Sequence, residues 1–183
     1  MENNYVVYHL HSDRSLLDSC TYFQDYIDRA VELNQKAIAF SEHGNIYNWL
    51  AKKLACDKAG IKYIHGVEIY LTEQLEPKVR DNYHTILLAK NYEGVKEINK
   101  LMNICTLDDH FYYKPRITFD EFLSISDNVI KISACLASPL RRLPNGDKKD
   151  KLLQKYDYYE LQPHINSDDQ KDYNKYLYQM SLK

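Results

Sequence analysis

The sequence alternates short apolar runs with longer amphipathic stretches, and this alternation limits the chain to few folds. The apolar runs predict buried strands, and apolar residues spaced three or four positions apart predict the helices between them. Strands that alternate with helices are typical of parallel strands joined by helical crossovers, so we expect one α/β domain over residues 1–183. The predicted strands are Val6–His11, Ala37–Phe40, Ile61–Ile64, Val67–Leu71, Thr85–Ala89, Val129–Ser133 and Tyr158–Leu161.

Local signals place the helices. The first runs from Phe23 to about Leu33, and Thr21 with Gln24 has the pattern of a capping box before it. A second helix ends at Gly60, which is a typical stop signal. We expect loops over residues 72–83 and 111–116. Further helices are predicted through Val95–Cys105, after a Thr118/Glu121 capping box, in a short turn at Pro139, and after Ser167 and Gln170.

Side chains that can bind metals follow the predicted strands. His9 and His11 are two residues apart, so on an extended strand they point to the same face. Imidazole, carboxylate and thiolate groups are the ligands of zinc and its neighbours. The C-terminal ends of parallel strands converge at one mouth in a barrel, so this pattern favours a barrel over an open sheet. The candidates are His9, His11, Asp18, His43, Glu68, His84, Cys135 and His164.

Each candidate also has an ordinary structural explanation. A histidine before a glycine, as in His43-Gly44, is typical of a turn, and an isolated cysteine such as Cys135 commonly behaves as a small buried hydrophobe. Their joint placement nevertheless predicts a site for several metal ions. A carboxylate such as Glu68 can bridge two ions, as a two-metal phosphoester site requires.

Composition and charge exclude some functions. The net charge of −2 gives no sign of a nucleic-acid or membrane surface, so contact with a polyanion would need a local patch or a metal. The four cysteines form no Cys-x-x-Cys pair. Residues 1–5 lack the features of a signal peptide, and no segment is apolar and long enough to span a bilayer. We therefore expect a reduced, cytoplasmic setting without membrane contact.

Several short motifs together resemble a known family. His9-x-His11, Ser41-Glu42-His43-Gly44-Asn45, Gly66-Val67-Glu68, His84 before an apolar strand and Ile132-Ser133-Ala134-Cys135-Leu136 resemble the successive motifs of the polymerase and histidinol phosphatase (PHP) domain. The resemblance covers nearly the whole chain. Ser12–Asp18, Tyr113–Ile117 and Ser133–Leu136 are similar to the version found at the N-terminus of bacterial DNA polymerase III alpha subunits.

This resemblance implies a distorted (β/α)7 barrel of the TIM type that holds up to three divalent ions, zinc or manganese. One ion would bind His9, His11 and Glu68, a second would bind Glu68, His84 and Cys135, and a third would use Asp18 and His43. His164 is an additional candidate. Catalytic members of the family cleave phosphoesters, and no catalytic group beyond the metal ligands is expected.

The sequence departs from the family pattern at two points. The family motif usually reads Thr-Asp-His where this chain has Ser41-Glu42-His43. The family pattern also ends with an Asp-x-His motif on a further strand, and no such motif follows the last predicted helix of this chain. Only the second ion would then have its full ligand set. We therefore expect a fragment of a longer polypeptide, with a barrel incomplete at its C-terminal side.

The resemblance leaves three functions open. The first function is that of a metal-dependent phosphoesterase of a DNA polymerase III alpha subunit, acting in DNA replication on a DNA 3′ end as an exonuclease or on pyrophosphate. Arg80, Lys114 and Arg116 are the candidates to hold the phosphate. The second function is a catalytically silent, metal-stabilised module that docks other polymerase domains or replisome subunits. The third is a free-standing phosphatase of the histidinol phosphate type, against which the Tyr113–Ile117 block argues.

Overall fold

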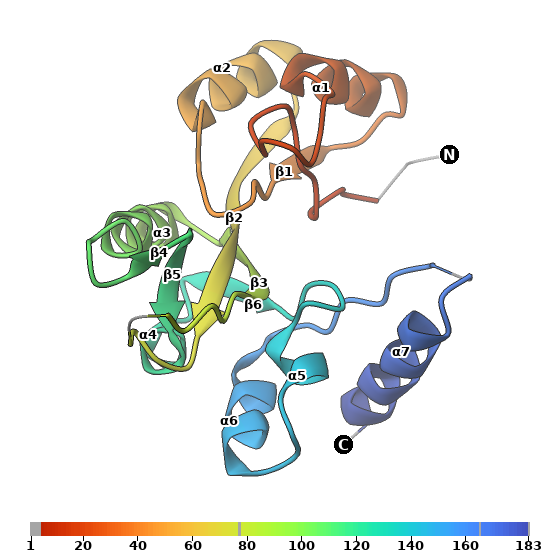
Figure 1. Ribbon diagram of the computed structural model, residues 1–183. Coiled ribbons are helices and arrows are strands. Elements are labelled where there is room, and N and C mark those ends of the chain that lie inside the picture. Colours follow the sequence, from red (N-terminus) through yellow and green to blue (C-terminus); the bar gives the residue numbers. More distant parts are fainter. Residues whose placement is uncertain (1–4, 77, 165, 183) are drawn as a thin grey trace.

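The computed structural model describes residues 5–76, 78–164 and 166–182. A twisted sheet lies in the middle of the molecule, and helices surround it (Figure 1). The helices α1 (Phe23–Glu32) and α2 (Trp49–Ala59) lie together at one end. The other helices are α3 (Tyr92–Ile104), α4 (Phe119–Ser124), α5 (Pro139–Arg142), α6 (Asp147–Lys155) and α7 (Asp168–Ser181).

The sheet is mixed. Its strands are β1 (Ala37–Phe40), β2 (Lys62–Thr72), β3 (Tyr83–Ala89), β4 (Phe111–Tyr112), β5 (Lys114–Thr118) and β6 (Val129–Ile132). The order is β4-β5-β2-β3-β6, and β1 pairs with the first half of β2. β2 is parallel to β1 and β5, whereas β3 is antiparallel to both β2 and β6. The expectation of parallel strands throughout is therefore wrong.

The two faces of the sheet have different roles. Alternate residues of β2 and β3, such as Ile69 and Leu87, pack into the largest apolar core with α3, α4, α6 and α7. A second core joins α1, α2 and β1. The opposite face of β2 and β3 carries Glu68, Tyr70 and His84, because successive strand residues point to opposite sides. This face holds the polar centre described below.

The sheet does not close into a barrel within the described residues. Two predicted strands, Val6–His11 and Tyr158–Leu161, are reduced to isolated bridges: Val7 pairs with Ile38 of β1, and Tyr158 pairs with Ile132 of β6. Each segment still runs along its neighbour as an irregular edge. The predicted strands Ile61–Ile64 and Val67–Leu71 are one continuous strand, β2, and the expected loop at residues 111–116 forms β4 and most of β5.

Most helix signals are confirmed. Gly60 ends α2 with φ of 73°, Thr118 and Glu121 form a reciprocal capping box, and Ser167 accepts a hydrogen bond from the Gln170 backbone N–H. The Thr21/Gln24 capping box is wrong, because the N-cap of α1 is Tyr22 and makes no side-chain cap. In the described part of the chain, every helix is too short or too polar to cross a membrane.

Candidate metal centre

Glu68 lies at the middle of the centre and is fully buried. It belongs to β2, and its neighbours come from the strands and segments on both sides. His84 lies near the start of β3 and pairs directly with Tyr70 of β2. Glu68, two residues before Tyr70, is therefore a diagonal neighbour of His84 on the same face of the sheet. The His84 Nδ1 atom lies 3.0 Å from Glu68 Oε1. The antiparallel register of β2 and β3 thus brings these two side chains together.

His43 reaches Glu68 from the other side. The segment after β1 continues along β2, where His43 forms a parallel bridge with Glu68 and the Gly44 N–H donates to the Glu68 carbonyl at 2.8 Å. His43 Nδ1 then lies 2.7 Å from Glu68 Oε2. Gly44 has φ of 60°, and a Cβ on it would lie 2.7 Å from the Tyr70 ring. Glycine is therefore required for this close turn.

His9 and His11 come from the edge segment beside β1. Backbone bonds from Ala39 to Val7 and from Ser41 to Leu10 hold this segment in place. The two imidazole Nε2 atoms lie 3.2 Å apart. His9 Nε2 is 3.7 Å from Glu68 Oε1, and His11 Nε2 is 3.3 Å from Glu68 Oε2. His9 and His11 lie on the same side of their segment, so both imidazole rings point toward Glu68.

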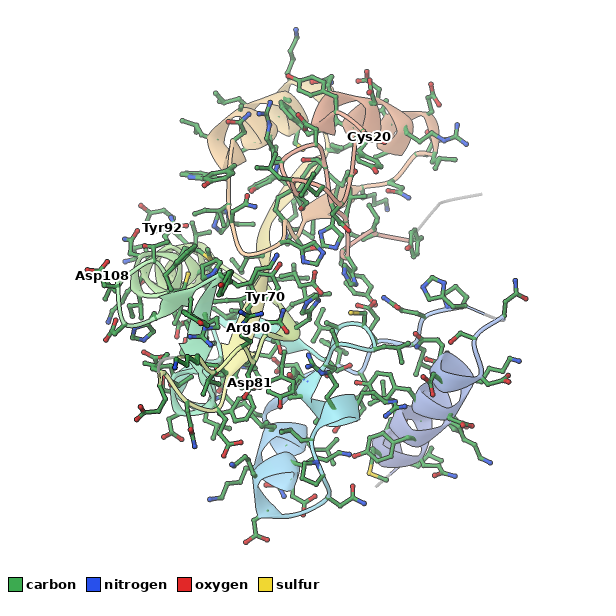
Figure 2. The ribbon with its side chains drawn as sticks, viewed as in Figure 1. Cys20, Tyr70, Arg80, Asp81, Tyr92 and Asp108 are labelled. Atoms are coloured by element: carbon green, nitrogen blue, oxygen red, sulfur yellow. The ribbon has the colours of Figure 1, made fainter. Side chains whose placement is uncertain are left out.

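Two further candidates lie at the periphery of the centre. Asp18 is exposed, and its Oδ2 lies 3.5 Å from His43 Nε2. Cys135 follows β6, and its Sγ lies 3.7 Å from His84 Nδ1. The exposed Cys20 lies on the α1 side of the molecule, away from Tyr70, which is near the middle (Figure 2). Cys135 is thus the cysteine that the fold brings to the centre.

The arrangement of donor atoms fits a divalent cation. Three groups, each with its ligand atoms within 4.8 Å of one another, overlap: His9/His11/Glu68, His11/Asp18/His43 and His43/Glu68/His84. His11 Nδ1 is buried and lacks a hydrogen-bond partner in the described structure, and the contacts of the buried His43 Nδ1 and Glu68 Oε2 are those within the centre itself, 2.7 Å from each other. Such buried polar atoms are costly unless something satisfies them. Nitrogen and carboxylate donors in this number are the ligand set of zinc, manganese and related ions.

The electrostatics of the centre favour a permanent negative charge on Glu68. Burial opposes this charge, but the imidazoles of His43, His84 and His9 outweigh burial and hold the Glu68 pKa far below its usual range. Burial, followed by the neighbouring His43, lowers the pKa of His11, so its ring is neutral and able to ligate. Burial raises the pKa of Cys135 to about 11, so the thiol is protonated without a cation beside it.

The PHP domain family matches residues 8–172. The chain belongs to this family. It is 39% identical over 147 residues to the DNA polymerase III alpha subunit of Borreliella burgdorferi, covering 77% of this chain and 13% of that protein. The alpha subunit of Aquifex aeolicus is 33% identical, with 74% of this chain and 13% of that protein covered. This PHP domain thus spans about an eighth of the length of the relatives it matches.

Solved structures show the same fold. A protein from Bifidobacterium adolescentis that is described as a "putative metal-dependent phosphoesterase" superimposes with a TM-score of 0.62 at 11% identity, covering 100% of this chain and 85% of that one. A two-domain protein from Bacteroides vulgatus containing a predicted PHP-like phosphoesterase gives a TM-score of 0.53 at 15% identity, covering 85% and 43%. At these identities the likeness establishes the fold alone.

The three cationic candidates of this PHP domain have different surroundings. Arg116 is buried, and its guanidinium donates to the carbonyl groups of Val79 at 2.7 Å and His110 at 3.3 Å, so this group serves the protein backbone and is not presented to a phosphate. Arg80 is exposed and packs on Tyr113. Lys114 Nζ lies 5.2 Å from the Tyr70 ring centre, and that ring in turn stacks on His43. The Tyr70 ring thus lies between Lys114 and His43 of the candidate metal centre.

The structure places Glu160, and not the predicted His164, in contact with a ligand candidate. His164 is exposed and lies outside the three donor groups, although it lines the same cavity of about 340 Å³ as His9 and His11. Glu160, which the sequence analysis did not select, contacts His9 directly. It lies within the Tyr158–Leu161 run, which the sequence analysis identified only as a strand. The signal that could have found it is its position at the end of a predicted strand.

Glu42, at the departure from the family motif, points away from the ligands. Its carboxylate accepts hydrogen bonds from the Ser12 backbone N–H and hydroxyl, from Ser15 Oγ at 2.6 Å and from Lys52 Nζ at 2.6 Å. The Ser15 hydroxyl oxygen also accepts from the His43 backbone N–H at 3.0 Å. Glu42 therefore fixes the loop between His11 and Asp18 against the His43 turn.

Proposed function

We propose that this PHP domain is a metal-dependent phosphoesterase module of a DNA polymerase III alpha subunit, with the 3′ end of DNA or pyrophosphate as its substrate class. The single observation that carries the proposal is the fully buried carboxylate of Glu68, with the imidazoles of His9, His11, His43 and His84 within 4 Å of its oxygens. The similarity to alpha subunits supports the replicative setting, with DNA, other polymerase domains and replisome subunits as partners.

The residues have separable tasks in this proposal. His9, His11 and Glu68 would hold one ion, Glu68, His84 and Cys135 a second, and Asp18 with His43 a third; zinc and manganese are the metals we propose. A bound divalent ion supplies the charge that lowers the pKa of water and stabilises the phosphoryl oxygens. His43 is within reach of both Glu68 and Asp18, so it can be shared between neighbouring groups. The exposed Lys114 and Arg80 would orient the anionic substrate.

A hydrolysis assay on the 183-residue chain tests this function. The chain is supplied with Mn²⁺ or Zn²⁺ and given a phosphomonoester, pyrophosphate or a 3′-tailed primer. We expect turnover that Glu68→Gln abolishes. Glu121→Gln is the matched control, because Glu121 also contacts a histidine, His110, but lies in α4 away from the centre. Metal binding without turnover of any of these substrates would contradict the phosphoesterase function.

One observation favours a second function, that of a metal-stabilised structural module. The candidate ligands come from both margins of the open sheet, since His9 lies in the edge segment beside β1 and Cys135 follows β6. Ions held between them would join these margins whether or not hydrolysis occurs. The module would then serve to dock a neighbouring domain. Metal-dependent stability combined with no hydrolysis is the result that distinguishes this second function.

A further inference from the structure

The contact between Glu160 and His9 joins segments 151 residues apart in sequence. His9 Nδ1 lies 2.7 Å from Glu160 Oε1 and 3.0 Å from Oε2. His9 belongs to the edge segment beside β1, and Glu160 belongs to the edge segment beside β6. The contact therefore spans the two margins of the open sheet, next to the candidate metal centre.

Glu160 is held rigidly in this position. Its side chain is 5% exposed, its backbone N–H donates to Ser133 Oγ at 2.9 Å, and Gln162 Nε2 donates to its Oε1 at 2.7 Å. The preceding residues are tied to β6, because Asp157 N–H donates to the Lys131 carbonyl at 2.9 Å and Ser133 N–H donates to the Tyr158 carbonyl. A carboxylate with so little freedom can set the orientation of the ring that it contacts.

The two nitrogens of His9 face different partners. Nδ1 faces Glu160, whereas Nε2 faces His11 Nε2 at 3.2 Å and Glu68 Oε1 at 3.7 Å. A histidine that donates its Nδ1–H to a carboxylate presents the lone pair of Nε2, and metal-ligating histidines commonly have such a partner. We propose that Glu160 is a positioning residue that fixes His9 with Nε2 directed into the metal centre. This inference rests on the proposed metal binding.

The geometry separates this role from direct ligation. Both carboxylate oxygens of Glu160 lie within 3.0 Å of His9 Nδ1 and thus on the far side of the ring from Glu68. Glu160 also belongs to none of the three donor groups. Its effect on the centre therefore passes through the His9 ring. Residues 157–160 are bonded to β6 through their backbone. A change in how this segment packs on β6 would therefore move Glu160 and alter the affinity for metal.

Metal titration of the 183-residue chain tests the role of Glu160. We expect Glu160→Gln to weaken Mn²⁺ or Zn²⁺ binding about 10-fold and Glu160→Ala by up to about 100-fold, the range found for partners of ligating histidines. The melting temperature of the metal-free chain should change little with Glu160→Gln, since the amide has the same shape. Glu121→Gln, which alters the His110 pair instead, should leave the metal affinity unchanged.

A spectroscopic readout separates positioning from a merely structural role. In the Zn²⁺-loaded chain, ¹⁵N-histidine NMR should show a strongly hydrogen-bonded Nδ1–H of His9, and Glu160→Gln should move this resonance while Glu121→Gln does not. Unchanged affinity and an unmoved resonance in Glu160→Gln would overturn the positioning role. Loss of one metal equivalent with an unmoved resonance would make Glu160 a ligand and would also overturn it. If the unsubstituted chain bound no metal, the proposed function itself would fail.

Discussion

Glu42, a buried carboxylate next to the centre, is matched by a partner of opposite charge. Lys52 lies in α2 with almost no exposure, and its Nζ is 2.6 Å from Glu42 Oε1. Burial opposes the charge on Glu42, but Lys52 and the Ser12 and Ser15 hydroxyls outweigh it and hold the Glu42 pKa below its usual range. Removing one partner of such a pair leaves the other charge buried and uncompensated.

Lys52→Met should therefore destabilise the chain by about 3–5 kcal/mol, as expected for breaking a buried ion pair. Lys53→Met is the matched control, because Lys53 is on the same helix but pairs with Asp57 at the surface, where such a pair contributes about 0–1 kcal/mol. Urea unfolding of both variants measures the difference. Equal, small losses in the two variants would show that Glu42 does not depend on Lys52 for its charge.

His110 provides a pH-dependent contribution to stability away from the centre. Burial works against its protonation, but hydrogen bonds with Asp109 and Glu121 raise the His110 pKa above its ordinary value of about 6.5. The stabilisation is therefore complete below about pH 6.5 and is lost as the pH rises through the raised pKa. Unfolding free energies measured from pH 6 to 9 should fall more steeply in the unsubstituted chain than in His110→Gln. Parallel curves would contradict this linkage.

Individual elements differ in how far their residues specify them. Helix α3 begins after Asn91, whose side chain accepts a hydrogen bond from the Gly94 N–H. This cap is local, so the sequence predicts the helix. By contrast, the edge segments at residues 6–11 and 158–161 have apolar runs like those of strands but pair through single bridges, because the sheet gives each of them a neighbour on one side at most. Pairing of this kind is a tertiary property that periodicity does not encode.

Gly94 shows such a tertiary constraint within a helix. A Cβ at this position would lie 2.2 Å from the Asn128 carbonyl oxygen, which is backbone and cannot easily move. Helix propensity favours Gly94→Ala by about 1 kcal/mol, whereas overpacking costs about 1–3 kcal/mol or more. We expect the clash to dominate and Gly94→Ala to be destabilising, while the neighbouring Glu93→Ala should be close to neutral. Denaturant midpoints of the two variants decide this, and a more stable Gly94→Ala would contradict it.

For the whole molecule, the sequence predicts the meeting of the candidate ligands better than it predicts the sheet. The predicted ligands His9, His11, His43, His84 and Glu68 do lie together. Convergence of parallel strand ends is not the reason, since Glu68 lies within β2 and His84 lies near the start of the antiparallel β3. The antiparallel direction of β3 and the open sheet could not be predicted from the sequence pattern, because the direction of a strand depends on the path of the segments that connect it to its neighbours. Glu160 was missed for a related reason, since its importance comes from a contact between the two margins of the sheet.

Metal should stabilise the whole chain, because the candidate ligands come from segments that are distant in sequence and lie on both margins of the sheet. An ion at 100 times its dissociation constant adds about 2.7 kcal/mol to the folded state when it does not bind the unfolded chain. For a chain of this size each kcal/mol shifts the melting temperature by about 2–4 °C. Saturating Zn²⁺ or Mn²⁺ should thus raise it by roughly 5–10 °C, and EDTA should reverse the shift. Glu68→Gln should lose most of this gain because Glu68 belongs to two of the three donor groups, whereas Glu121→Gln should keep it. If neither metal nor chelator changed the melting temperature, the buried imidazoles and carboxylate would satisfy one another, and their meeting would stabilise the fold without binding a metal.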